Sequence, residues 1–262
     1  MIIAGVDIGS RHTKVVLVDR LGNILAVYSS RTRPPLIDLV DSNIENALKQ
    51  IGALRTDVSY VATTGFGRSS YPDRDLQLTD VTSAAFGAMH AFPNTKCVID
   101  IGAQSSRAMK LAPDGRVREF KSNDKCAAGA GGFVERAAHY LEVPLEDVGR
   151  LSMNGNTPVT ISSVCAVLAE SEIINHVSRG ETAEDILRGV HDSLSERATL
   201  LLKRIGIESE VTLVGGMGNQ EGMIRSLSDT LGMPMNCPEN PEMINALGAA
   251  LLGIRKLEKS AA

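Results

Sequence analysis

The chain opens with short apolar runs that are separated by polar residues and glycine. Residues 2–7, 14–18 and 24–28 are predominantly apolar, with a turn-forming segment between the second and third runs. This pattern predicts three strands joined by turns. Apolar residues then recur at the helical interval over positions 37–51, which predicts an amphipathic helix, and residues 59–63 predict a further strand.

The same plan returns in the second part of the chain. Residues 97–103 repeat the apolar run that ends in Asp-Ile-Gly at positions 7–9. Residues 107–111 and 117–121 then predict the second and third strands of another meander. Two Asp-Ile-Gly elbows, each followed by a meander, indicate an internal duplication.

The rest of the chain is predicted to be mainly helical. The strongest helical stretches are 133–141, 166–177 and 183–205. Residues 211–214 predict a strand leading into Gly215-Gly216, and further helices are predicted over 221–231 and 242–257. No low-complexity linker separates the halves. We therefore expect an α/β protein with two lobes around a cleft, the first over residues 1–95 and the second over 96–241. The closing helix at 242–257 is expected to pack back on the first lobe.

Composition narrows the class of function. Hydrophobic residues make up 43% and charged residues 22% of the 262 positions, as in ordinary globular proteins. A net charge of −4 and an aromatic content of 3% argue against nucleic-acid binding. The N-terminus lacks a signal-peptide pattern, and no apolar run has the roughly 18 residues of a membrane span. We therefore expect a cytoplasmic protein whose four cysteines are thiols or metal ligands.

The two elbows carry chemistry that suits a nucleotide. Glycine lets backbone amides approach phosphate oxygens, and a carboxylate holds Mg²⁺ through water. We predict that Asp7 and Asp100 position Mg²⁺ and water, and that Gly215 and Gly216 line the nucleoside. The residues predicted to bind phosphate are Gly9, Ser10, Thr13, Lys14, Gly102 and Ala103. An ordinary strand-ending turn is the alternative interpretation of each elbow taken singly.

Two cysteines precede predicted helices. Cys126 lies before residues 133–141, and Cys165 lies directly before residues 166–177. The partial positive charge at a helix N-terminus lowers the pKa of a thiol and favours an anionic cluster. Two thiolates are half of what a [4Fe–4S] cluster normally takes, and a two-fold dimer would supply the other half. A buried structural role is the alternative for each cysteine, and Cys97 and Cys237 are not assigned to metal.

The segments around these cysteines resemble a known family. Residues 123–129 and 162–172 are similar to the two cysteine motifs of the 2-hydroxyacyl-CoA dehydratase activators, a family that includes the ATP-binding subunits of benzoyl-CoA reductase. The similarity extends over nearly the whole chain, with further matching motifs at residues 5–10, 63–68, 214–216 and 246–251. The resemblance implies the duplicated actin/sugar-kinase/Hsp70-like (ASKHA) fold around a nucleotide cleft.

The resemblance also implies a mechanism. It implies an oxygen-sensitive homodimer, or a heterodimer with a related ATPase subunit, in which Cys126 and Cys165 of each copy hold one bridging [4Fe–4S] cluster. Binding and hydrolysis of ATP to ADP would drive a low-potential electron to an acyl-CoA dehydratase or to benzoyl-CoA reductase catalytic subunits. Ferredoxin or flavodoxin would be the electron donor.

The second elbow departs from the family pattern. The activators usually have Asp-Ile-Gly-Gly-Gln-Asp followed by a lysine two positions on. This chain keeps Gln104, which we predict to be catalytic together with the two elbow aspartates, but has Ser105 and Arg107 in place of the acid and the lysine. Loss of the acid is expected to alter metal positioning or slow hydrolysis, and it favours a heterodimeric reductase component more than the family pattern alone would.

Two other functions share this fold. A sugar or acyl-group kinase would need a catalytic base near the γ-phosphate and would have no use for paired cysteines at helix starts. An actin-like scaffold would bind nucleotide and assemble without a cluster. Both would purify as colourless proteins, which separates them from an iron–sulfur electron carrier.

Overall fold

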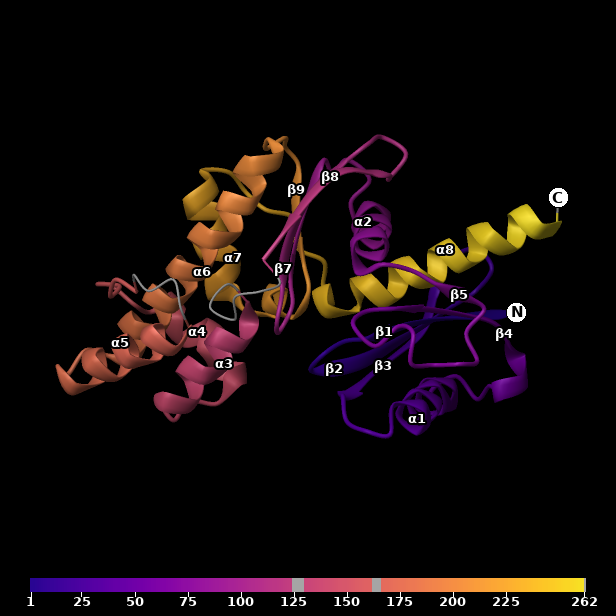
Figure 1. The fold of residues 1–262 in the computed structure, drawn as a ribbon, viewed down its shortest axis with the longest axis horizontal. Coiled ribbons are helices and arrows are strands. Elements are labelled where there is room, and N and C mark those ends of the chain that lie inside the picture. The colour runs from indigo at the N-terminus through magenta and orange to yellow at the C-terminus, as the bar shows by residue number, and fades with distance from the viewer. Residues whose placement is uncertain (124–129, 162–165, 262) are drawn as a thin grey trace. The chain divides into compact units, whose positions relative to one another are not determined.

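The computed structural model of the chain describes residues 1–123, 130–161 and 166–261. The chain divides into two compact units, each with its own sheet and its own hydrophobic core (Figure 1). Unit 1 comprises Met1–Pro93, Pro113–Val117 and Met243–Ala262, and unit 2 comprises Asn94–Ala112 and Arg118–Glu242.

Unit 1 is built on a five-stranded sheet in the order β3-β2-β1-β4-β5. β1 pairs antiparallel with β2 and parallel with β4, so the meander and the later strand meet at β1. The bounds are β1 Ile2–Ile8, β2 His12–Val18, β3 Ile24–Arg31, β4 Val58–Thr64, β5 Leu76–Gln77, η1 Arg55–Asp57, α1 Leu36–Lys49, α2 Asp80–Ala91 and α8 Ile244–Ala261.

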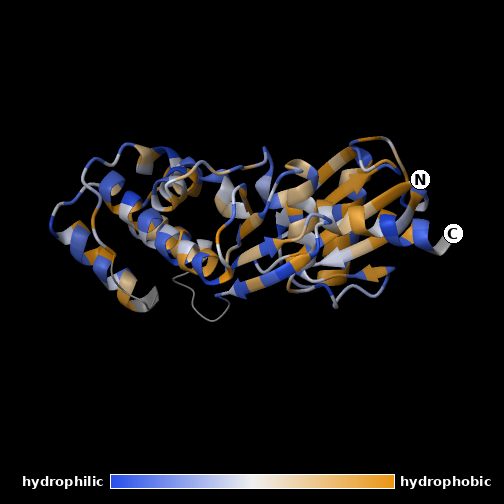
Figure 2. Cartoon of the chain, turned by 90° about the horizontal axis from the view of Figure 1, so that it is seen from above, coloured by the Kyte–Doolittle hydropathy of each residue, from blue (hydrophilic) through white to orange (hydrophobic). Residues whose placement is uncertain are grey.

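The two faces of β1 pack against different helices, because successive side chains of a strand point to opposite faces. Val6 and Ile8 share a buried core with Ile44 and other residues of α1. On the other face α8 packs against β1, and a Cβ at Gly5 would overlap the carbonyl oxygen of Ala246. β1 is therefore buried on both faces, and the strands near the N-terminus are correspondingly hydrophobic (Figure 2).

Unit 2 is built on a four-stranded sheet in the order β8-β7-β6-β9. β6 pairs antiparallel with β7 and parallel with β9, which repeats the arrangement around β1. The bounds are β6 Cys97–Ile101, β7 Ser106–Leu111, β8 Val117–Ser122, β9 Val211–Val214, α3 Gly131–Tyr140, α4 Val148–Met153, α5 Ala166–Ser178, α6 Ala183–Ile205, α7 Glu221–Leu231, η3 Leu145–Asp147, η4 Gly216–Asn219 and η5 Pro241–Met243.

Helix α6 is the centre of the packing in unit 2. It contacts α3, α4, α7 and the strands β6 and β7, and it contributes a row of fully buried residues to the core. Thr182 caps its N-terminus by accepting a hydrogen bond from the backbone N–H of Asp185, and the helix ends before Gly206. No helix within the described ranges has the length and apolar character needed to cross a bilayer.

Most elements lie where the sequence predicts them, but the pattern gave no sign of α2. This helix is rich in alanine and contains Gly87 in its interior, which weakens a helical pattern. The glycine is explained by packing within unit 1, because a Cβ there would overlap the carbonyl oxygen of Ile244 at the start of α8. The short elements β5 and α4 were also absent from the prediction.

Candidate functional site

The first elbow lies between β1 and β2 in unit 1. Asp7 is only 4% exposed, and its Oδ2 accepts a hydrogen bond from Lys14 Nζ at 2.9 Å. The turn is closed by the Gly9 N–H, which donates to the carbonyl oxygen of His12 at 3.2 Å. A buried carboxylate with a lysine partner thus stands at the start of a tight glycine turn.

The end of the parallel neighbour β4 packs directly against this carboxylate. Gly65 follows β4 with a φ of 90°, a left-handed conformation that favours glycine. A Cβ at Gly65 would overlap Asp7 Oδ1. The Gly67 N–H donates to the carbonyl oxygen of Ile8 at 2.8 Å, which fixes the turn to the end of β1.

The second elbow, in unit 2, repeats this geometry. Asp100 is 2% exposed and pairs with Arg107, whose Nη1 lies 3.6 Å from its Oδ2. The Gly102 N–H donates to the carbonyl oxygen of Ser105 at 2.9 Å and closes the turn. Gly215 follows β9 with a φ of 87°, and a Cβ there would lie 2.6 Å from Asp100 Oδ1.

Strand register makes the two elbows correspond residue by residue. Asp7 lies opposite Lys14 on β2, as Asp100 lies opposite Arg107 on β7. Arg107 therefore occupies in the second elbow the position that Lys14 occupies in the first. Gly65 is a site residue that the sequence analysis did not select, although the repeated glycine after each parallel strand was a usable signal.

The other residues predicted at the first elbow differ in their surroundings. Ser10 is exposed at the turn. Thr13 is buried on the strand face opposite Lys14, and its hydroxyl shares a hydrogen bond of 2.9 Å with the hydroxyl of Thr32. Thr32 in turn donates to the carbonyl oxygen of Gly9 at 2.8 Å, so Thr13 supports the elbow from behind.

The glycine turn predicted for the nucleoside follows β9. The Gly215 N–H donates to the carbonyl oxygen of Pro241 at 2.9 Å, while Gly216 is exposed and a Cβ there would meet no atom within 4 Å. Asn219, at the end of η4, donates from Nδ2 to Glu242 Oε2 at 3.0 Å. The backbone of Gly216 is therefore accessible to a ligand, and the hydrogen-bonded side chains of Asn219 and Glu242 belong to the same turn region.

The first turn of α3 is attached to the second elbow. The Gly131 N–H donates to the carbonyl oxygen of Gly102 at 2.9 Å, and the Gly132 N–H donates to that of Ala103 at 2.8 Å. A Cβ at Gly131 would also lie 2.9 Å from Met217 Sδ in η4. The start of α3 thus touches both glycine motifs of unit 2, whereas Gln104 is exposed at the same elbow.

The helices α3 and α5 are joined by a small polar cluster. Arg136 Nε forms an ion pair with Glu170 Oε1, and Tyr140 donates from its hydroxyl to Glu170 Oε2 at 3.2 Å. The hydrogen bond to this carboxylate raises the pKa of Tyr140. Glu170 therefore connects the helix that begins directly after Cys165 to the helix that follows the Cys126 segment.

Cys126 and Cys165, the predicted cluster ligands, lie outside the described residues. Of the cysteines that are described, Cys97 is buried in β6 and burial raises the pKa of its thiol. Burial raises the pKa of Cys237 to about 11. Both thiols are therefore protonated near neutral pH. No group of three or more His, Cys, Asp or Glu side chains within the described ranges is arranged to hold a metal ion.

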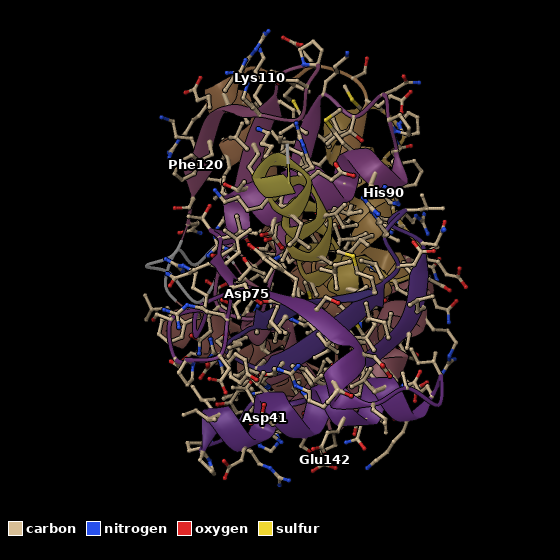
Figure 3. All side chains as sticks on the ribbon, turned by 90° about the vertical axis from the view of Figure 1, so that its right-hand side faces the viewer. Asp41, Asp75, His90, Lys110, Phe120 and Glu142 are labelled. Atoms are coloured by element: carbon tan, nitrogen blue, oxygen red, sulfur yellow. The ribbon has the colours of Figure 1, made fainter. Side chains whose placement is uncertain are left out.

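Other prominent polar groups serve local structure. Asp75 accepts from the Val61 N–H at 2.7 Å and Asp41 accepts from the Tyr71 hydroxyl at 2.6 Å, and both aspartates are labelled in Figure 3. Burial raises the pKa of Tyr71 to about 12, so its phenol stays protonated. Lys110 pairs with Glu208 at 2.6 Å. These groups stabilise turns and strand ends.

The chain is similar to known proteins along its whole length. It is 37% identical over 262 residues to the 2-hydroxyisocaproyl-CoA dehydratase activator of Clostridioides difficile, covering 99% of this chain and 97% of that protein. It is 36% identical over 272 residues to a subunit of the benzoyl-CoA reductase of Thauera aromatica, covering 99% of this chain and 95% of that protein.

Solved structures agree with this similarity. The activator of the 2-hydroxyisocaproyl-CoA dehydratase from Clostridium difficile with bound ADPNP superimposes with a TM-score of 0.94 and 36% identity, covering 100% of this chain and 97% of that one. A ROK family glucokinase from Streptomyces griseus, at 15% identity and a TM-score of 0.63, covers 97% of this chain and 100% of that one and shares the fold alone. The predicted ASKHA fold class is therefore confirmed.

A family model described as the BadF/BadG/BcrA/BcrD ATPase family matches residues 4–253. This range includes both elbows, the glycine turn after β9 and the segments that contain the two predicted ligand cysteines. The chain belongs to the BadF/BadG/BcrA/BcrD ATPase family.

Proposed function

We propose that this protein is an ATP-dependent activator that hydrolyses ATP and delivers low-potential electrons to an acyl-CoA dehydratase. The electrons pass through one [4Fe–4S] cluster shared by two copies of the chain. The observation that carries this proposal is the match to a dehydratase activator over 99% of this chain and 97% of that relative. A match of that extent leaves no large part of the relative without a counterpart here.

The elbow residues suit a magnesium nucleotide. Carboxylate oxygens and backbone amides are the groups that Mg²⁺ and phosphate require, and both elbows supply them beside a fixed cation. Asp7 and Asp100 would hold the hydrated metal when it is bound, and Lys14 and Arg107 would neutralise the buried carboxylates and attract phosphate oxygens. Gln104 orients the water that attacks the γ-phosphorus, the bond to the bridging oxygen breaks, and ADP and phosphate leave.

Hydrogen bonds and an ion pair could transmit a conformational change from the second elbow to the helices that follow the two cysteine segments. The carbonyl oxygens of Gly102 and Ala103 accept hydrogen bonds from the first two backbone N–H groups of α3. The carboxylate of Glu170 in α5 binds two side chains of α3. A change of elbow conformation between ATP and ADP must therefore move α3 or break these bonds. Such coupling requires two conformations of the protein and a nucleotide that shifts the equilibrium between them.

Cys126 and Cys165 are the proposed cluster ligands. When bound, a [4Fe–4S] cluster supplies one-electron transfer. Since α5 begins at Ala166, the thiolate of Cys165 precedes a helix start, where the helix dipole favours negative charge. Burial raises the pKa of Cys97 and Cys237, which makes each of them a poorer thiolate donor than an unperturbed cysteine.

Anaerobic purification with iron analysis tests the proposal. We expect a brown dimer with about four irons per two chains. Cys126→Ser and Cys165→Ser should each abolish the visible absorbance, whereas the matched controls Cys97→Ser and Cys237→Ser should keep it. A colourless protein after careful cluster reconstitution, with ATP-dependent phosphorylation of a sugar or acyl group, would instead establish a kinase.

The similarity to a benzoyl-CoA reductase subunit supports a second candidate. In that case the chain would work beside a non-identical ATPase subunit, and the cluster would bridge the two. The mass of the anaerobically purified protein separates the candidates. A homodimer that carries iron when this chain is produced alone supports the dehydratase activator, and a monomer that gains iron only with a second, different chain supports the reductase.

A further inference from the structure

Thr64 is a buried hydroxyl beside the first elbow that the protein leaves without a hydrogen bond. It is the last residue of β4 and is 0% exposed. Its Oγ1 has no hydrogen-bond partner among the described residues. Buried hydroxyls are nearly always paired, because a buried polar group without a partner costs free energy. Thr64 therefore calls for an explanation.

Strand register places Thr64 next to Asp7. The two residues are direct partners in the parallel pairing of β1 and β4, and Asp7 is the direct partner of Lys14 on β2. Directly opposed residues present their side chains to the same face of a sheet. Lys14, Asp7 and Thr64 thus form one row across three strands, with the turn at Gly65 packed against the carboxylate.

Neighbouring threonines show that this fold readily satisfies such hydroxyls. Thr63, on the opposite face of β4, donates to the carbonyl oxygen of Arg68 at 2.9 Å. Thr13 shares its hydrogen bond with Thr32. In the second elbow the residue opposite Asp100 is Val214, which has the shape of threonine and no hydroxyl. The fold therefore accepts an apolar residue at this position, and the hydroxyl of Thr64 is not needed for packing.

We propose that Thr64 is a positioning residue for the magnesium nucleotide, and this rests on the proposed function. Its hydroxyl binds a water of the Mg²⁺ coordination shell together with the carboxylate of Asp7. Mg²⁺ usually keeps several of its waters, and a hydroxyl can both donate to and accept from them. The first elbow thus offers a magnesium ion a carboxylate and a hydroxyl, whereas the second elbow has only a carboxylate at the corresponding positions.

Thr64→Val tests this inference because valine preserves the shape. We expect the Mg²⁺ concentration for half-maximal ATP hydrolysis to rise about tenfold or more, with a lower kcat. Nucleotide affinity measured in EDTA should change less than about twofold, and Thr64→Ser should restore the Mg²⁺ dependence. The melting temperature of the nucleotide-free variant should equal or exceed that of the wild type, since an unpaired hydroxyl is removed.

Thr63→Val is the matched control. Its hydroxyl has a structural partner, so this variant should lose melting temperature and keep the wild-type Mg²⁺ dependence. A Thr64→Val protein with wild-type Mg²⁺ dependence, in a preparation whose wild type hydrolyses ATP, overturns the role of Thr64 and leaves the proposed function standing. A Thr64→Val protein that melts early and loses nucleotide affinity in EDTA equally overturns it in favour of packing. A wild type that neither binds nor hydrolyses ATP overturns both proposals.

Discussion

The elbow at Asp7 and the elbow at Asp100 share a backbone and differ in their side chains. Both place a buried aspartate opposite a cation and against a glycine with a φ near 90°. In unit 1 the cation is Lys14 at 2.9 Å, and in unit 2 it is Arg107 at 3.6 Å. The residue opposite the aspartate on the parallel strand is Thr64 in one unit and Val214 in the other.

The surroundings of the two elbows differ as well. The second elbow is hydrogen-bonded to the first turn of a helix, whereas the first is supported from behind by Thr13 and Thr32. Duplication has kept the geometry that glycine and register impose and has let the side chains diverge. We interpret the first elbow as the better equipped for the metal, and the second as the one connected to the rest of its unit.

The largest expected effect comes from breaking the shared feature in each unit. Gly65→Ala and Gly215→Ala should each cost at least about 3 kcal/mol in unfolding free energy, since both combine a left-handed φ with overlap on a carboxylate oxygen. Denaturant unfolding followed by circular dichroism measures this. Gly216→Ala is the control, because its Cβ would meet open space, and it should stay within about 0.5 kcal/mol of the wild type. Equal stability of all three variants would contradict the role given to these glycines.

A fall in pH should destabilise unit 2 more than unit 1. His191 in unit 2 is fully buried, whereas the histidines of unit 1, His12 and His90, are exposed. Burial, assisted by the charge of Arg188, lowers the pKa of His191 from 6.5 to about 4. The unfolded chain therefore binds the proton more readily, so unit 2 has its full stability above pH 6.5 and loses up to about 3 kcal/mol as the pH falls to about 4.

Hydrogen exchange, corrected for its intrinsic pH dependence, checks this prediction by comparing peptides of α6 with peptides of β1 and β2. His191→Gln removes the titrating group and should flatten the response of α6. Loss of protection in both units at the same pH, unaffected by that substitution, would point to another group.

A smaller effect is expected at the hydrogen bonds between the second elbow and the first turn of α3. Gly132→Ala places a Cβ 2.8 Å from the carbonyl oxygen of Ala103, so the start of α3 must shift away from the elbow. On the proposed function, ATP hydrolysis should continue while electron delivery per ATP falls about tenfold, equivalent to ~1.4 kcal/mol of coupling. Parallel measurement of phosphate release and of partner reduction gives the ratio, and an unchanged ratio would show that α3 does not transmit the change.

The smallest effect should come from making the two cations alike. Arg107→Lys should change stability by less than about 1 kcal/mol, because the 3.6 Å separation between Arg107 Nη1 and Asp100 Oδ2 leaves room for an ammonium group. Lys14→Arg should cost more, since Lys14 Nζ already lies 3.2 Å from the position of a Cβ at Gly9. Thermal melting of the two variants measures the difference, and the reverse order would mean that the second elbow is the tighter one.

Much of the fold could be predicted because the apolar pattern is strong. The bounds of α6, α7 and β9 agree with the prediction, and every strand of the two meanders was expected. The helix α2 was missed because its packing depends on a glycine whose purpose lies at the start of α8.

The site was predictable in part. The aspartates and elbow glycines follow from local sequence, and the glycine after each parallel strand was a usable signal for Gly65. Thr64 meets Asp7 only through the parallel pairing of β1 with β4, which no local pattern reveals. Strand alternation also distinguishes Thr13 from Lys14. Thr13 adjoins Lys14 in a strand, so the two side chains point to opposite faces, and strand alternation could have separated their roles in advance.

The hydrogen bonds at Gly131 and Gly132 give α3 the properties of a lever arm. Its 10 residues span about 15 Å, with the fulcrum at the elbow carbonyls and Tyr140 at the far end. A slight tilt at the fulcrum becomes a larger displacement where the Tyr140 hydroxyl meets Glu170. On the proposed function, a small rearrangement of the second elbow around a phosphate would therefore be larger at Glu170 than at the elbow itself.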